Sequence, residues 1–215
     1  MIKKTVLSGI TVLALGTAAI QAESTFYDPA PAYAPGTAGP YIGLGYSRAS
    51  VDDNYFEFYP YDGYSVDAQI DFDSMMFQAG YKYNPYIAFE FRYWISVGDG
   101  DISTNPTVPN IAGYNDFDAW GVYLKPMYPV TPEFNIYGLL GFSGTYVEGE
   151  PGWDLLNDAD FSWGGGVSFD VTLNISIFVD YVQLFDDTIG FYSYDYEYED
   201  DIRVDTWNIG INYKF

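Results

Sequence analysis

From about residue 40 onward, apolar and polar residues alternate along most of the chain with a period of two. The last nine residues show this most clearly. Five large apolar side chains share one face of this stretch: Trp207, Ile209, Ile211, Tyr213 and Phe215. Small or polar residues fill the positions between them, as expected for a β-strand with two different faces. A chain that ends on such a strand is typical of a transmembrane β-barrel, in which the apolar face meets lipid.

Eight runs show this alternation, and each is long enough to cross a bilayer as a tilted strand. They cover about residues 40–51, 68–83, 86–96, 117–128, 134–147, 160–171, 174–185 and a last run that ends at 215. Very short turns alternate with long acidic connections at 52–66, 97–116, 148–159 and 186–201. This asymmetry predicts an all-β protein, an eight-stranded antiparallel up-and-down transmembrane β-barrel over residues 40–215.

The first 39 residues do not fit the barrel pattern. Lys3 and Lys4 precede an apolar run that ends in small residues near Ala22, which is the pattern of a secretory signal peptide over residues 1–22. Residues 23–39 are rich in proline, alanine and glycine and are expected to form a periplasmic leader. Both chain ends are then expected in the periplasm, and the barrel in the outer membrane of a Gram-negative bacterium.

The charge balance restricts the partners of the protein. The formal net charge is −22, and the expected signal peptide contains two of the eight lysines and arginines. Six basic residues therefore accompany 30 acids in the rest of the chain, which argues against nucleic acid as a partner. Aromatic residues make up 20% of the sequence, as suits girdles at two membrane interfaces. The expected contacts are outer-membrane lipid and lipopolysaccharide.

The inward faces of the runs distinguish this barrel from a soluble one. A soluble ligand-binding barrel carries its large apolar residues inside. Here the strand positions opposite the large apolar residues, which are predicted to face the lumen, include five charged residues: Lys82, Glu90, Arg92, Lys125 and Asp180. We therefore expect a polar lumen that is closed by its own charges.

The sequence lacks the residue patterns that enzyme activity, metal binding or cofactor binding would require. The chain has no histidine and no cysteine, so it lacks the histidine and serine pair on which outer-membrane lipid acyltransferases and deacylases rely. The segment Asp99–Asp101 is too short for a helix-loop-helix calcium loop. We expect no enzyme activity, no cofactor and no metal site.

Three segments resemble the transmembrane domain of outer membrane protein A. They are GYKYNPYIAFEFRY at 80–93, KPMYPVT at 125–131 followed by NIY at 135–137, and GGV at 165–167. The resemblance covers about residues 40–215 and implies the same kind of small barrel. The peptidoglycan-binding domain that follows the barrel in that relative has no counterpart before Phe215, so no cell-wall anchoring role is expected.

The resemblance also implies a gate inside the barrel. Glu90 matches the family's lumenal glutamate, and Lys125 matches a lysine that pairs with it. The arginine of the family's gate would fall near Phe178, so that partner is missing. Arg92, two residues from Glu90 on the same inward face, is a candidate replacement that would compete for Glu90. The implied function is a structural barrel with at most a narrow gated pore for small solutes or ions.

The acidic connections suggest an alternative function. Tyrosines and acids alternate in 52–66 and 186–201, and tyrosine is a good contact residue. These segments could act as an adhesin or receptor surface for a basic partner, or hold divalent cations shared with lipopolysaccharide. A plainer interpretation is that the strands simply extend beyond the membrane as hairpins with solvated acids.

The aromatic C-terminus on the lipid-facing side suggests one further partner. Phe215, with Tyr213 and Ile211 on the same face, resembles the recognition signal for the outer-membrane assembly machinery. We therefore expect these three residues to form a membrane-assembly signal.

Overall fold

The computed structural model describes residues 38–59, 62–105, 116–148, 154–193 and 196–215. The predicted signal peptide and nearly all of the predicted leader lie outside these ranges and remain predictions. Nine strands are present in the described part: β1 (Gly39–Tyr59), β2 (Asp62–Asn84), β3 (Ile87–Ser96), β4 (Asp101–Asn105), β5 (Asp116–Pro129), β6 (Phe134–Glu148), β7 (Asp154–Asp170), β8 (Ile175–Ser193) and β9 (Tyr196–Lys214). None of the described residues belongs to a helix long and apolar enough to cross a membrane.

Eight of these strands close into a barrel. The hydrogen-bonded order is β1-β9-β8-β7-β6-β5-β3-β2, and β2 pairs back with β1. All the pairings are antiparallel. The short strand β4 pairs with β2 beside the barrel, from Asp67 to Asp71. The prediction of an eight-stranded antiparallel up-and-down barrel is therefore confirmed, with β4 as an addition that the sequence pattern did not indicate.

The outer surface of the barrel is a broad apolar band. Large apolar side chains at alternate positions of the strands are exposed, among them Phe77, Phe89, Trp163 and Ile209. On β6, Ile136, Leu140 and Phe142 are 48–60% exposed, so this strand also turns large apolar side chains outward. An exposed apolar band of this extent is stable in lipid and not in water.

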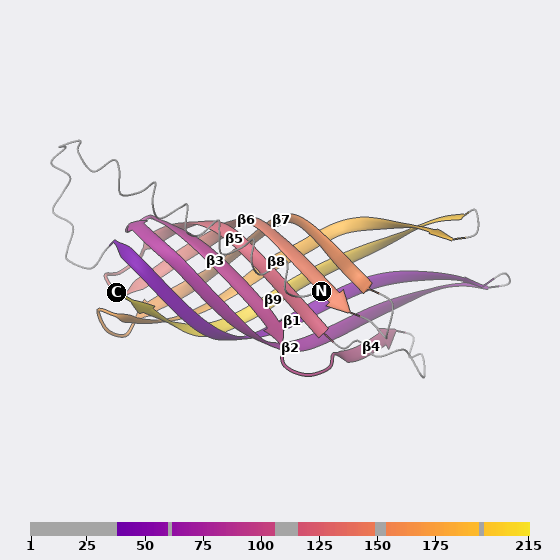
Figure 1. Cartoon of the computed structure of the whole chain (residues 1–215), viewed down its shortest axis with the longest axis horizontal. Helices are drawn as coiled ribbons and strands as arrows, with labels where there is room; N and C mark the ends of the chain where they lie inside the picture. The colour runs from indigo at the N-terminus through magenta and orange to yellow at the C-terminus, as the bar shows by residue number, and fades with distance from the viewer. Residues whose placement is uncertain (1–37, 60–61, 106–115, 149–153, 194–195) are drawn as a thin grey trace. The chain divides into compact units, whose positions relative to one another are not determined.

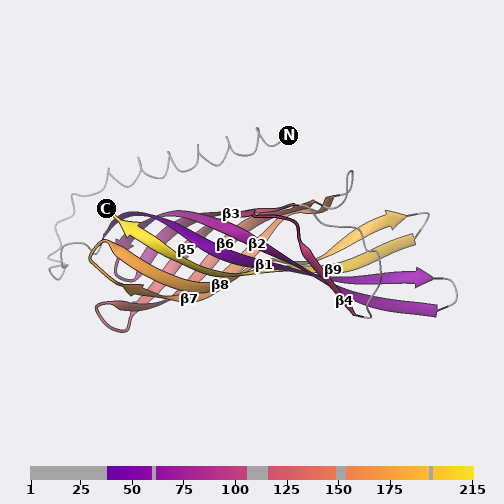
Figure 2. The ribbon, with the colours of Figure 1, turned by 90° about the horizontal axis from the view of Figure 1, so that it is seen from below.

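The two ends of the barrel differ strongly. At one end, here called the turn end, short turns join β2 to β3, β5 to β6 and β7 to β8. At the other end, here called the hairpin end, β1–β2 and β8–β9 extend far beyond the other strands (Figures 1 and 2). Their pairing continues to Tyr59↔Asp62 and Ser193↔Tyr196.

These extensions correct the predicted loop boundaries. Residues 52–59, 62–66, 186–193 and 196–201 lie in strands, so the prediction of long loops at 52–66 and 186–201 is wrong. The plainer interpretation, extended hairpins, is confirmed. Each extension satisfies its backbone hydrogen bonds by pairing, and β1 also pairs with β9 up to Asn54↔Asp201. The four strands β8, β9, β1 and β2 therefore leave the barrel as one sheet, which divides beyond Asn54↔Asp201 into two separate hairpins (Figures 1 and 2).

Glycine at position 141 allows β6 to approach β5 closely. A Cβ atom added at Gly141 would overlap the backbone carbonyl of Val122, whereas one added at Gly138 would make only ordinary contacts, with Pro126 Cγ at 3.6 Å and the Gly164 carbonyl oxygen at 3.8 Å. We expect Gly141→Ala to destabilise the barrel by about 1–3 kcal/mol, because the backbone of β5 would have to shift. Gly138→Ala is the matched control on the same strand and should have little effect. Urea unfolding in detergent, followed by gel mobility, would measure both; equal midpoints would contradict the close approach.

Candidate functional site in the barrel lumen

Four buried charged side chains meet inside the barrel and form what we call the lumenal cluster: Glu90, Arg92, Lys125 and Asp180. Arg92 Nε donates to Glu90 Oε1 at 2.6 Å, and Lys125 Nζ donates to Glu90 Oε2 at 2.8 Å. The two terminal nitrogens of Arg92 donate to the two oxygens of Asp180 at 2.9 and 2.7 Å. At most 5% of any of these side chains is exposed. Two positive and two negative charges therefore balance inside the barrel.

The barrel wall brings the cluster together from both sides of the lumen. Glu90 and Arg92 alternate with lipid-facing residues on β3, and Lys125 lies on the adjacent strand β5. Asp180 lies on β8, on the opposite side of the closed strand order. The Arg92–Asp180 pair therefore crosses the lumen. A charge-assisted, two-point pair of this kind is among the strongest hydrogen-bonded contacts in proteins.

Neutral polar groups complete the hydrogen bonding of the two carboxylates. Tyr41 donates its hydroxyl to Glu90 Oε2, and Tyr137 donates to Asp180 Oδ2 at 2.7 Å. Asn208 Nδ2 donates to Asp180 Oδ1 at 2.8 Å. The Lys125 ammonium also lies 3.9 Å from the centre of the Tyr137 ring, a favourable cation–π distance. Buried charges are tolerated only with such full pairing.

Four of the five charged residues predicted to lie in the lumen form the lumenal cluster. Glu90, Arg92, Lys125 and Asp180 come together, whereas Lys82 makes no ion pair with any described residue and lies nearer the turn end. Arg92 was expected to compete with Lys125 for Glu90, and this is wrong: each cation binds its own oxygen of the carboxylate. The Arg92 guanidinium carbon lies 5.9 Å from the ring centre of Phe178, the position near which the resemblance would have placed an arginine.

The sequence analysis did not identify three residues that donate hydrogen bonds to the lumenal cluster: Tyr41, Tyr137 and Asn208. Each occupies an inward position in its strand, so the period-two pattern could have placed it in the lumen. It could not have shown that their polar groups reach Glu90 and Asp180.

The lumen is not polar throughout, which corrects the expected polar lining. Between the lumenal cluster and the hairpin end, buried apolar side chains from most of the strands fill the interior: Val51, Ile70, Phe72, Phe117, Val147, Leu156, Leu184, Ile202 and Val204. We call this set the apolar layer. Within it the Phe72 and Phe117 rings are stacked with their centres 5.7 Å apart. The inside of the barrel is thus packed at two successive levels, first by charge pairs and then by hydrocarbon.

The basic residues near the hairpin end are already paired with acids. Arg48 donates to Asp71 and Asp73 at 3.2 and 3.0 Å, and Arg203 lies 3.6 Å from Asp205. Burial raises the pKa of the Asp205 carboxyl, and Arg203 opposes that rise. Neither arginine is left free to attract an anion.

The residues of the expected assembly signal face outward. Ile211, Tyr213 and Phe215 are 47–68% exposed. The ring of Phe215 packs edge-to-face on that of Tyr213, with ring centres 5.1 Å apart.

In the described part of the chain, no group of three histidine, cysteine or acidic residues is arranged to hold a metal ion.

Comparisons with known proteins agree with this architecture. Residues 10–215 match the family described as outer membrane protein beta-barrel domain, so the chain belongs to that family of outer-membrane β-barrels. The attachment invasion locus protein of Yersinia enterocolitica is 26% identical over 180 residues, which are 81% of this chain and 84% of that protein.

Two solved structures share the fold. The attachment invasion locus protein Ail of Yersinia pestis, in complex with the heparin analogue sucrose octasulfate, superposes with a TM-score of 0.51 at 19% identity, covering 83% of this chain and 99% of that one. The outer membrane protein AlkL in lipid bilayers gives 0.59 at 13% identity, covering 88% and 97%. At these identities the likeness concerns the fold alone.

Proposed function

We propose that this protein is a closed outer-membrane barrel that acts at the cell surface through the sheet of β8, β9, β1 and β2, as an adhesin or receptor. One observation carries the proposal: the lumen is filled at two levels, while these four strands continue well beyond the other strands of the barrel (Figure 1). In this proposal the hairpin end faces outward, the turn end faces the periplasm, and both chain termini are periplasmic. The relationship to an attachment invasion locus protein supports it.

The charge of the hairpin end indicates the class of partner. The segments 52–66, 97–116, 148–159 and 186–201 contain no lysine or arginine, and Arg48 and Arg203 are paired with acids. A sulfated polysaccharide needs unpaired cations, so the heparin analogue held by the Yersinia pestis protein is not the expected ligand here. The partner we propose is a basic protein surface.

Binding measurements on the barrel in lipid nanodiscs test this proposal. The probes are a lysine-rich peptide and heparin, each at physiological salt. The variant Asp52→Asn/Asp186→Asn/Asp201→Asn removes three charges from the four-stranded sheet. We expect it to bind the peptide about tenfold more weakly, since each exposed charge contributes roughly 0.2–1 kcal/mol.

The matched control removes three charges elsewhere at the same end: Asp99→Asn/Asp101→Asn/Asp158→Asn. It should bind the peptide nearly as the unchanged protein does. Equal weakening in the two variants would mean that net charge, and not the sheet, attracts the peptide. Tight binding of heparin would contradict the proposed partner class directly.

A narrow gated pore is the second candidate function. The observation that favours it is the Glu90–Lys125 contact at 2.8 Å, which agrees with the gate implied by the resemblance to outer membrane protein A. Single-channel recording separates the two candidates. A closed barrel should show no stable conductance, whereas long-lived open levels in the unchanged protein would favour the pore and count against a filled lumen.

A further inference from the structure

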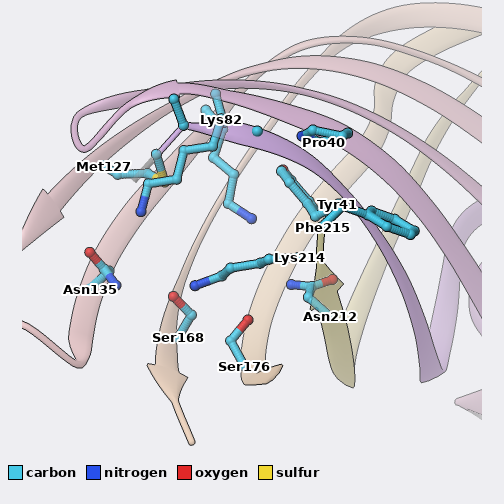
Figure 3. Close-up of a pocket in the computed structure, with 14 residues that line it drawn as sticks. Pro40, Tyr41, Lys82, Met127, Asn135, Ser168, Ser176, Asn212, Lys214 and Phe215 are labelled. Carbon is cyan, nitrogen blue, oxygen red and sulfur yellow. The ribbon is translucent and has the colours of Figure 1, made fainter. Parts of the chain in front are cut away.

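A small hollow opens inside the turn end of the barrel, and Figure 3 shows the residues that line it. Each of the eight barrel strands contributes a residue to its lining. Its volume is about 40 Å³. Since one water molecule needs about 10–15 Å³ of such space, the hollow has room for about three or four water-sized groups.

Hydrogen-bond donors dominate the polar part of the lining. The ammonium groups come from Lys82, Lys125 and Lys214, on three different strands. Asn135 and Ser176 are buried and yet make no side-chain hydrogen bond to any described residue. Asn212 accepts a hydrogen bond from Gln78 through its oxygen, and its amide nitrogen turns toward the hollow in Figure 3.

Among the described side chains around the hollow, one ammonium group is left without an acidic partner. Lys125 is paired with Glu90 at 2.8 Å, and Lys214 is paired with Asp170 at 2.5 Å. Lys82 has no acidic partner within 4 Å among the residues that the structure describes. An unpaired ammonium in a narrow, partly buried space attracts an anion, because water there is scarce and the effective dielectric constant is low.

We propose that this hollow binds a phosphate group, with Lys82 as its main cation and the side chains of Asn135, Ser176 and Asn212 as neutral donors. The donors surround the hollow on several strands, which suits the several acceptor oxygens of a tetrahedral anion better than the two coplanar oxygens of a carboxylate. The hollow has room for three or four oxygen-sized groups, close to the four oxygens of one tetrahedral anion. This site is independent of what the hairpin end binds.

Two sources could supply the phosphate group. One is free inorganic phosphate, and the other is a monoester headgroup whose lipid tail stays outside the hollow. Both present the same chemistry to Lys82, so the experiment includes both. The lipid probe is the soluble dihexanoyl phosphatidic acid.

Calorimetric titration of the folded barrel in detergent, at constant ionic strength, tests the site. Inorganic phosphate should bind the unchanged protein, and Lys82→Gln should lower the affinity at least tenfold. Lys82→Arg should retain binding, because it keeps the charge. Arg203→Gln removes one positive charge at the opposite end and is the matched control, so it should bind phosphate as the unchanged protein does. Heat-dependent gel mobility verifies that every variant is folded.

The comparison of probes completes the test. Acetate should bind more weakly than phosphate, and the stronger of inorganic phosphate and dihexanoyl phosphatidic acid identifies the source. If neither phosphate compound binds more tightly than chloride, or if folded Lys82→Gln binds as the unchanged protein does, the proposal is wrong.

Discussion

Replacing Arg92 with methionine is expected to destabilise the folded barrel by roughly 3–5 kcal/mol. Arg92 pairs with both Glu90 and Asp180, and none of the three side chains is exposed. The change leaves Asp180 without a cationic partner and Glu90 with Lys125 alone. The free energy of unfolding, from urea titration in detergent, measures the effect.

Two further variants make this prediction specific. Arg48→Met removes a half-exposed arginine that also pairs with two aspartates, and it should cost less than about 1 kcal/mol. In the second, Glu90→Gln, Lys125→Met and Asp180→Asn accompany Arg92→Met, so that no charge of the lumenal cluster remains. This variant should recover most of the lost stability. If Arg92→Met unfolds at the same urea concentration as Arg48→Met, the lumenal cluster is hydrated rather than buried.

Replacing Phe215 with alanine is expected to reduce the amount of barrel assembled in the outer membrane several-fold. The Phe215 ring is 68% exposed and touches Tyr213, so its loss removes little packing from the folded protein. Its role, in our hypothesis, is recognition by the assembly machinery. Heat-modifiable protein in isolated outer membranes measures assembly.

The adjacent residue provides the control for this prediction. Lys214 faces the lumen, where it pairs with Asp170, so Lys214→Ala should assemble nearly normally. Both variants should refold equally well into detergent from urea. Equal losses in cells would contradict a recognition role for the aromatic ring, and a refolding defect confined to Phe215→Ala would assign the ring a structural role instead.

The barrel wall was predictable because lipid imposes a strict pattern on it. Outward positions such as Phe142, Trp163 and Ile209 must be apolar, whereas inward positions such as Asn208 need not be. The sequence of the extended hairpins does not follow this strict apolar pattern. Alternating tyrosines and acids in 186–201 therefore resembled a loop, although backbone pairing continues through β8 and β9 to Ser193↔Tyr196.

The lumenal cluster was predictable only in part. Glu90 and Lys125 lie on neighbouring strands, and the resemblance already linked them. The Arg92–Asp180 pair joins strands on opposite sides of the lumen, and such a contact depends on closure of the barrel and on its diameter. The apolar layer was not predicted because nothing in the sequence marks an apolar residue such as Phe72 or Val204 as one that faces the lumen.

The continuous pairing of β1 with β9, from Tyr41↔Lys214 to Asn54↔Asp201, has a mechanical consequence. Hydrogen bonds between antiparallel strands run across the strand direction. A pull on the β8–β9 hairpin, directed along its strands, is therefore resisted as shear by the whole ladder at once rather than by one bond after another. The hydrogen bonds between β1 and β9 therefore share a force applied to the hairpin, and they pass it to the barrel wall without breaking one after another.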